Sequence, residues 1–353
     1  MKLLLICPSL KNSGPINVVL SLIKNINPKL FKITVIYFFS DSAEYKQILQ
    51  DKGVKFVRLD GSLIHRAFSL YQQIKIIKPD VIHSHCLLPD ALVWLLSPFI
   101  SSRKLTTIHC NLLEDYRTEY PLIKGYIYYK LHKIFLKNFN KVVTVSKSAG
   151  GCLDNIETYT IYNGVDSLAQ NEQKIFKAEN INFVFLGRLI PRKNVMFLVK
   201  AIEELKNKYD LRVTVEIFGD GPEFDELKEQ ASSDFIFHGF IDNPLNLISK
   251  ESILVNPSYS EGMPMAVLEF ISLGLPVLLS NISSHQELKD KIQSGVEIFD
   301  LSFESFEEAY LKIIKDNKTL NFNKQEMLEN FNLNFSSDAM VQSYSAIYEQ
   351  LSS

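Results

Sequence analysis

Two glutamates eight positions apart, Glu261 and Glu269, bracket the stretch EGMPMAVLE. The run before them, SILVNPS, is apolar and β-branched, which is typical of a buried strand. Pro264 suits the first turn of a helix, because an amide there has no helical partner to lose. The pattern therefore predicts a strand, a loop that holds Glu261, and a helix that holds Glu269. Unpaired amides at the start of such a helix form a site for anions.

The surroundings of Glu269 are apolar on both sides, with AVL before it and FI after it. A carboxylate in such a segment is costly unless it finds hydrogen-bond partners, and a pair of ligand hydroxyls would supply them. The alternative from the spacing alone is a helix-start glutamate followed by one that faces solvent.

A second group of charged residues lies in FLGRLIPRKN, residues 185–194. Arg188 and Lys193 fall in the loop between a predicted strand and a helix predicted to begin near Asn194. Cations at the positive end of a helix are unfavourable unless an anion lies between them. Arginine offers a planar fork and lysine a point charge, a combination that suits phosphates. For this motif alone, a solvated basic loop is the simpler interpretation.

The sequence contains no Asp-x-Asp, so a diphosphate held through that motif and a metal ion is not expected. A departing diphosphate would need another source of positive charge, which Arg188 and Lys193 would provide. We therefore predict that the site uses no metal ion and no cofactor. His83, His85 and Cys86 suggest a zinc site, but ligands confined to four residues give poor tetrahedral geometry. A pair of hydrogen-bonded histidines at a strand end is the favoured interpretation.

Short apolar runs alternate with helical patterns along the whole chain. In the first half the predicted strands are KLLLICP, KITVIYFF, DVIHSH, LTTIHC and KVVTVS, and in the second half they are INFVFLGR, RVTVEIFG, DFIFHGF, SILVNPS and GLPVLLS. Such strands, separated by helices, indicate parallel sheets covered on both faces. Each half is therefore predicted to be a doubly wound α/β domain, which binds ligands beyond the carboxyl ends of its strands. The polar segment 167–180 is the predicted linker.

The composition is that of a globular protein, with 46% hydrophobic and 22% charged residues in 353, enough for two domains. No apolar run is long enough to span a bilayer, the start MKLLLICPSL is too short for a signal peptide, and four cysteines without C-x-x-C spacing suit a reducing compartment. We therefore expect a cytoplasmic protein. The net charge of −2 combines +9 in residues 1–170 with −11 in the remainder. Without a recognisable binding motif, this charge does not favour nucleic-acid binding.

Four motifs occur in the order and spacing seen in retaining glycosyltransferases of family four, which the chain resembles. They are GRLIPRKN, FGDGP (218–222), HGF (238–240) and PSYSEGMPMAVLEFISLGLPVLLS (257–280). The first half resembles this family more loosely, through VIHSH, TIHC, VSKSA and NGVD. The resemblance implies the GT-B fold, in which two Rossmann-like doubly wound parallel-sheet domains face each other across a cleft. It implies an acceptor-side domain at 1–166, a nucleotide-sugar-binding domain at 167–337, and a terminal helix at 338–353 that crosses back to the first domain.

The resemblance also implies roles for single residues. Arg188 and Lys193 match the pair that binds the donor diphosphate, and Glu269 matches the glutamate that accepts hydrogen bonds from the ribose. Glu261 matches the glutamate near the transferred sugar, and His109 matches a first-domain histidine that contacts this sugar. Further donor contacts are implied for the glycine loop, the HGF motif and the start of the helix, namely Gly14, Gly239, Phe240, Gly262, Met263, Met265, Ala266 and Val267.

The activity implied by the resemblance is that of a metal-independent hexosyltransferase. It would move a sugar, with retention, from a nucleotide-sugar donor, most commonly a UDP-sugar, to a glycan or lipid-linked glycan acceptor in bacterial surface polysaccharide synthesis. One alternative is a nucleotide-sugar epimerase on the same fold, which needs no acceptor, and another is a non-catalytic nucleotide-sugar-binding protein. A nicotinamide-dependent dehydrogenase is disfavoured because G-x-G-x-x-G is absent.

A basic segment at 117–141 carries six lysines and arginines and one acidic residue. Its lysines at 130, 133, 137 and 141 recur at helical spacing, and Leu131, Phe135 and Phe139 lie broadly opposite them, so the helix is predicted to be amphipathic. One interpretation is a helix packed on the core with a solvated basic face. The other hypothesis is attraction to anionic lipid headgroups, which would make the protein peripheral on the inner face of the membrane.

Overall fold

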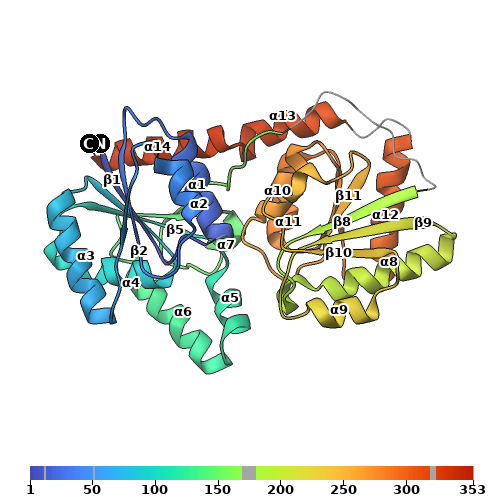
Figure 1. Cartoon of the computed structure of the whole chain (residues 1–353), viewed down its shortest axis with the longest axis horizontal. Coiled ribbons are helices and arrows are strands. Elements are labelled where there is room, and N and C mark those ends of the chain that lie inside the picture. The colour runs from blue at the N-terminus through green and yellow to red at the C-terminus, as the bar shows by residue number, and fades with distance from the viewer. Residues whose placement is uncertain (12, 51, 169–179, 319–322, 353) are drawn as a thin grey trace. The chain divides into compact units, whose positions relative to one another are not determined.

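The computed structural model describes residues 1–11, 13–50, 52–168, 180–318 and 323–352, which fall into two α/β units (Figure 1). Unit 1 comprises Met1–Gly164 and Ser337–Ser353, and unit 2 comprises Val165–Ser336. The predicted linker at 167–180 lies for the most part outside the described residues. Among the described residues, no helix has both the length and the apolar character needed to cross a membrane.

Unit 1 is built on a seven-stranded parallel sheet with the order β3-β2-β1-β4-β5-β6-β7. The chain runs from β1 outward to β3 and then returns to β4, so the strand order reverses between β1 and β4. The strands are β1 (Lys2–Cys7), β2 (Lys32–Tyr37), β3 (Lys55–Arg58), β4 (Val81–His85), β5 (Arg103–Ile108), β6 (Lys141–Thr144) and β7 (Thr158–Thr160). The helices are α1 (Gly14–Asn25), α2 (Ala43–Gln50), α3 (Leu63–Ile77), α4 (Leu87–Leu96), the 3-10 helix η1 (Ser97–Phe99), α5 (Leu112–Glu119), α6 (Leu122–Leu136), α7 (Lys147–Gly150) and the C-terminal α14 (Ser337–Ser352).

A buried polar network joins three of these helices to the sheet. The Asp90 carboxylate on α4 accepts hydrogen bonds from Ser84 at 2.5 Å and from Thr106 at 2.8 Å. His132 on α6 lies 2.8 Å from the other Asp90 oxygen, and its second ring nitrogen lies 2.8 Å from the Tyr116 hydroxyl on α5. Because a buried carboxylate is tolerated only when its oxygens are paired, this network sets how α4, α5 and α6 lie on the sheet.

Unit 2 is built on a six-stranded parallel sheet with the order β10-β9-β8-β11-β12-β13. Here the strand order reverses between β8 and β11. The strands are β8 (Asn180–Leu186), β9 (Arg212–Phe218), β10 (Phe235–Gly239), β11 (Ser252–Asn256), β12 (Val277–Ser280) and β13 (Val296–Phe299). The helices are the 3-10 turns η2 (Pro191–Lys193) and η3 (Pro244–Asn246), α8 (Val195–Tyr209), α9 (Phe224–Gln230), α10 (Met265–Ser272), α11 (Ser283–Ile292), α12 (Phe303–Lys318) and α13 (Lys324–Phe335).

The predicted pair of doubly wound parallel sheets is confirmed, and each of the ten predicted strands is present. Three further strands, β3, β7 and β13, were not predicted, and all three lie at sheet edges. Helix α14 belongs to unit 1 and packs on its sheet, where the hydroxyls of Tyr344 and Tyr348 lie 2.9 Å from Thr107 and 2.7 Å from His83.

Candidate functional site

In unit 2, the two motifs predicted to do chemistry follow neighbouring strands. Residues 187–194 follow β8 and residues 257–264 follow β11, and these strands pair in parallel. Parallel neighbours end at the same edge of a sheet, so the two loops meet. The strand order also reverses here, and an open α/β sheet binds its ligands at such a point.

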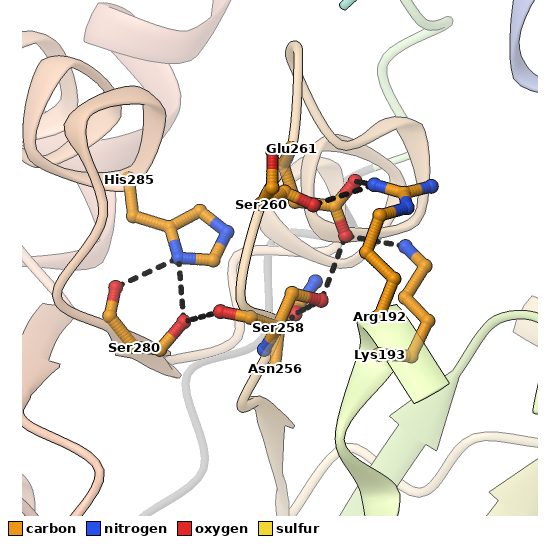
Figure 2. A network of polar contacts seen from close by, with 8 residues as sticks. All are labelled: Arg192, Lys193, Asn256, Ser258, Ser260, Glu261, Ser280 and His285. Atoms are coloured by element: carbon orange, nitrogen blue, oxygen red, sulfur yellow. Dashed lines mark hydrogen bonds and ion pairs between the residues drawn. The ribbon is translucent and has the colours of Figure 1, made fainter. Parts of the chain in front are cut away.

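Hydrogen bonds join the two loops directly. The Tyr259 amide donates to the Arg192 carbonyl at 2.9 Å, and the Asn194 side-chain amide donates to the Pro257 carbonyl at 3.3 Å. The Arg192 guanidinium in turn donates to the Ser260 carbonyl (Figure 2). The loop after β8 is therefore held against the loop after β11 before any ligand binds.

The FGDGP turn after β9 supports the same loop from the other side. A Cβ atom on Gly219 would lie 1.8 Å from the Gly187 carbonyl oxygen, and one on Gly221 would lie 2.2 Å from the Leu189 carbonyl oxygen. The Leu189 amide donates to the Asp220 carbonyl at 2.9 Å. Only glycine permits so close an approach of two backbones, which explains the two glycines of this motif.

Glu261 lies at the centre of the joined loops, with its side chain only 7% exposed (Figure 2). One carboxylate oxygen forms an ion pair with Lys193 and lies 2.8 Å from the Ser258 hydroxyl, and the other lies 3.3 Å from Arg192. Burial acts to raise the pKa of Glu261, but the charges of Lys193 and Arg192 outweigh it and lower the pKa to about 2. The side chain is therefore an anion at neutral pH. It can accept hydrogen bonds or stabilise positive charge, but it cannot donate a proton.

A chain of polar groups behind Glu261 extends to helix α11 (Figure 2). The Ser258 hydroxyl also lies 2.5 Å from the Asn256 side-chain oxygen, and the Ser258 carbonyl accepts from Ser280 at 2.6 Å. His285 lies with its Nδ1 atom 2.8 Å from the Ser280 carbonyl, and burial lowers its pKa to about 4. Asn256, Ser258, Ser280 and His285 were not predicted as site residues. In the sequence each shows only as a polar residue near the end of an apolar strand or the start of a helix.

Glu269 has a different environment from Glu261. It is the fifth residue of α10, and burial among apolar side chains raises its pKa to about 7. Its carboxylate has no hydrogen-bond partner within the part of the chain that the structure describes. Two carboxylates eight positions apart thus have pKa values on opposite sides of the ordinary range, because one is paired with cations and the other is not.

The two predicted cations differ in their surroundings. Lys193 contacts Glu261, whereas Arg188 is exposed, and its guanidinium forms no ion pair or hydrogen bond with any described residue. Arg192, which was not predicted, occupies the second cationic position beside Glu261. Its position directly before Lys193 was the available signal.

The other predicted donor-binding residues of unit 2 lie at the end of β10 and around the start of α10. Gly239 ends β10, and Phe240 follows with 60% of its side chain exposed. Helix α10 begins at Met265, so Pro264 caps the helix and does not lie in its first turn as predicted. Buried residues around this helix start are Gly262, Met263 and Val267, and half-buried ones are Met265 and Ala266.

In unit 1, His109 directly follows β5 and belongs to a cluster of three histidines. Its Nε2 atom lies 3.0 Å from Nδ1 of His85, the last residue of β4, and burial lowers the pKa of His109 to about 3. His83 has Nδ1 at 2.7 Å from the Tyr348 hydroxyl and Nε2 at 2.8 Å from the Thr107 hydroxyl. Because both its ring nitrogens are occupied, His83 has none left for the zinc ion considered above. With this lowered pKa, His109 is uncharged at pH 7.

Gly14 and His85 lie where the strand order of unit 1 reverses. Gly14 follows β1 as the first residue of α1, is exposed, and has nothing within 4 Å of the position that a Cβ atom would take. His85 is buried, and its Nε2 atom lacks a partner among the described residues. Within the part of the chain that the structure describes, no group of three or more His, Cys, Asp or Glu side chains is placed to hold a metal ion. That the site needs no metal stays a prediction.

Both parts of the chain match models of one enzyme class. Residues 180–316 match the model for glycosyl transferases group 1, and residues 13–167 match the model for glycosyltransferase family 4. The chain belongs to the group 1 glycosyltransferases, family four.

Known relatives agree with this membership. The Escherichia coli O-antigen biosynthesis glycosyltransferase WclY is 29% identical over 307 residues, which cover 83% of each chain. The E. coli UDP-Gal:alpha-D-GlcNAc-diphosphoundecaprenol alpha-1,3-galactosyltransferase is 27% identical over 281 residues, 72% of this chain and 70% of that enzyme. The crystal structure of Anabaena Alr3699/HepE in complex with UDP and glucose superposes with a TM-score of 0.81 at 16% identity, covering 99% of each chain. The predicted GT-B fold is confirmed.

The raised pKa of Glu269 predicts a pH-dependent effect of Glu269→Gln on stability. Since the folded-state pKa of about 7 exceeds the ordinary value of 4.5, ionisation destabilises the native state as pH rises through this window. Glu269→Gln should leave the free energy of unfolding unchanged below pH 4.5 and raise it by about 1–3 kcal/mol at pH 8. Urea unfolding at several pH values measures this. Glu229→Gln, at an exposed position on α9, is the control, and equal pH profiles for both variants would contradict the assignment.

Proposed function

We propose that this glycosyltransferase moves a sugar from a uridine diphosphate donor, with retention of anomeric configuration, to a lipid-linked or growing glycan of a bacterial surface polysaccharide. The observation that carries the proposal is the buried Glu261 anion, held by Lys193 and Arg192 where β8 and β11 end. Two E. coli relatives support it, since one is named for O-antigen biosynthesis and the other for UDP-Gal and alpha-D-GlcNAc-diphosphoundecaprenol.

The positive groups would act on the departing diphosphate. Arg188 is exposed and uncommitted, and it lies in the same loop as Lys193, which Glu261 already holds in place. Fixed charges aimed at the oxygen where negative charge develops stabilise a transition state without the cost of reorganisation. In this proposal the guanidinium and ammonium groups take the place of a divalent ion.

The two glutamates would act on different parts of the donor. As a permanent anion, Glu261 would accept hydrogen bonds from hydroxyls of the transferred sugar and stabilise the positive charge of an oxocarbenium-like transition state. Glu269, which lacks a partner among the described residues, would accept hydrogen bonds from both ribose hydroxyls. His109 would form hydrogen bonds with the sugar as an uncharged side chain. Because burial lowers its pKa, it would carry no positive charge that could bind the diphosphate.

A donor screen followed by product analysis tests the function. Thermal unfolding with a panel of nucleotide sugars should show a rise in Tm with one or more UDP-sugars, because a ligand that binds only the native state stabilises it. Incubation of that donor with lipid-linked acceptors should then give a glycoside of the same anomeric configuration as the donor, read by NMR. An inverted product would overturn retention. Conversion of the donor to its epimer without acceptor would favour the epimerase instead.

Removal of either proposed cation should slow turnover. We expect Arg188→Ala and Lys193→Ala to lower kcat by about 10²–10³, the typical effect of losing one transition-state donor. Arg188→Lys and Lys193→Arg keep the charge and should lose less. The control is Arg212→Ala, because Arg212 is exposed at the opposite, amino end of β9. Unchanged kcat in Arg188→Ala would refute its role.

Lys193→Ala needs a companion variant, since it leaves Glu261 buried beside one cation. Breaking a buried ion pair by removing one partner costs about 3–5 kcal/mol, whereas replacing both partners is often neutral. The double variant Lys193→Met/Glu261→Gln should therefore unfold near the wild-type temperature and still lack activity. A double variant that folds and retains turnover would show that the pair is only structural.

Donor binding should release a proton from Glu269. In the free protein its pKa of about 7 leaves much of the carboxyl protonated at pH 6.5, and ribose hydroxyls that donate to the charged form would lower this pKa. Calorimetry of UDP-sugar binding at pH 6.5, in buffers of different ionisation enthalpy, should detect the proton, and affinity should rise from pH 6 to 8. Glu269→Gln should show neither effect. Proton release that persists in this variant would assign the titration to another group.

A further inference from the structure

The outward face of helix α6 in unit 1 is apolar. The helix turns Gly125, Tyr129, His132 and Leu136 to the core, and side chains spaced for the opposite face are exposed. We call these side chains the outward stripe: Ile123 (81% exposed), Ile127 (50%), Leu131 (40%) and Ile134 (48%). Four large exposed apolar side chains on one face of a helix differ from the scattered exposure that is normal on a protein surface.

The orientation of α6 is fixed by its inward face. A Cβ atom on Gly125 would lie 2.3 Å from the Tyr116 carbonyl oxygen, so only a glycine lets α6 come this near to α5. His132, on the same face, is held between Asp90 and the Tyr116 hydroxyl. Rotation of α6 to bury the outward stripe would break these buried hydrogen bonds, so the stripe stays exposed in the folded unit.

Lysines border the outward stripe on both sides. By helical spacing Lys124 lies along one side and Lys130 and Lys137 along the other, and all three are exposed. Helix α6 contains no acidic residue. Tyr126 lies beside Lys130, whose ammonium is 5.1 Å from the ring centroid, and Tyr126 is 46% exposed. An apolar row with lysines and a tyrosine at its margins is the composition of helices that lie in a membrane interface.

The element next to α6 adds to the exposed apolar surface. Helix α4 packs against α6, with the rings of Trp94 and Phe135 4.9 Å apart. At the end of α4, Leu95 is 50% exposed, and Phe99 of the adjoining η1 is 63% exposed. Figure 1 shows α6 at the periphery of unit 1.

We propose that α6 is a membrane-docking helix that binds the surface of an anionic lipid bilayer. The outward stripe would enter the boundary between headgroups and acyl chains, while Lys124, Lys130 and Lys137 would pair with lipid phosphates. Charge selects this occupant over a second copy of the chain, because two such faces would bring lysines against lysines. Membrane binding itself does not depend on the proposed function. Only its purpose does, which is to bring the enzyme to a lipid-linked acceptor.

Vesicle sedimentation of the full chain tests the proposal without donor or acceptor, so the result does not depend on transferase activity. The probes are vesicles of phosphatidylcholine with phosphatidylglycerol and vesicles of phosphatidylcholine alone. The protein should sediment with the anionic vesicles at low salt, and binding should fall as salt screens the lysines. Absence of binding to anionic vesicles at low salt would overturn the proposal.

Two triple variants separate the apolar and charged contributions. Ile123→Ser/Ile127→Ser/Ile134→Ser should weaken partitioning by at least about tenfold, because each change removes apolar area from the bilayer. Lys124→Gln/Lys130→Gln/Lys137→Gln should weaken it by about 100-fold at low salt, at about fivefold for each lysine. The affected side chains are exposed, so Tm should stay close to that of the wild type, which thermal unfolding checks.

Matched controls make the same changes elsewhere. Leu247→Ser/Leu311→Ser/Leu333→Ser alters exposed leucines of unit 2, and Lys32→Gln/Lys200→Gln/Lys228→Gln removes the same charge from exposed positions. Both controls should bind like the wild type. Equal loss of binding in variants and controls would show that the surface is not α6. A wild-type dimer in sedimentation velocity that the isoleucine variant dissociates would assign the outward stripe to self-association and overturn membrane docking.

Discussion

The ion pair between Glu261 and Lys193 is the interaction on which the arrangement of the site depends. A carboxylate that is 7% exposed persists as an anion only if cations and hydrogen-bond donors compensate for its lost hydration. Lys193 and Arg192 come from the loop after β8, whereas Glu261 comes from the loop after β11. The pair therefore requires that these strands be neighbours, and it joins two motifs that lie 68 residues apart in the sequence.

Pairing with cations also gives the two glutamates different pKa values. Glu261 has its charge balanced within the protein, so its pKa falls to about 2, whereas burial without a cation raises the pKa of Glu269 to about 7. Burial disfavours the charged form of Glu269. A ligand that donates two hydrogen bonds to the carboxylate would favour this form and so lower the pKa. The same EGMPMAVLE stretch thus holds one carboxylate whose charge the protein balances with cations and one whose charge it does not balance.

The architecture followed from the sequence, but the contacts within the site did not. Central strands are buried on both faces and show as unbroken apolar runs, whereas the edge strands β3, β7 and β13 are short and partly exposed, so their patterns are weak. Contacts between residues far apart in the sequence also could not be predicted, because the spacing indicated only that a bound anion lies between Arg188 and Lys193. In the structure a carboxylate of the protein, Glu261, is the partner of Lys193, and Arg192 joins it because the 3-10 turn η2 places both side chains on the same loop.

Helix α6 shows the limit of periodicity most clearly. Spacing predicted an amphipathic helix but placed Leu131 with Phe135 and Phe139 on the side opposite the lysines, where Phe139 does pack into the core and Leu131 does not. Hydrophobic periodicity cannot identify the buried face of a helix when that face contains a glycine and a histidine. Their burial depends on Tyr116 and Asp90, which belong to other elements. The result is a helix that buries a glycine and a histidine beside Tyr129 and Leu136, while its isoleucines are exposed. A local departure of this kind is expected where a surface serves binding, and in the proposed docking the lipid phase would supply the apolar contact that the fold does not give the isoleucines.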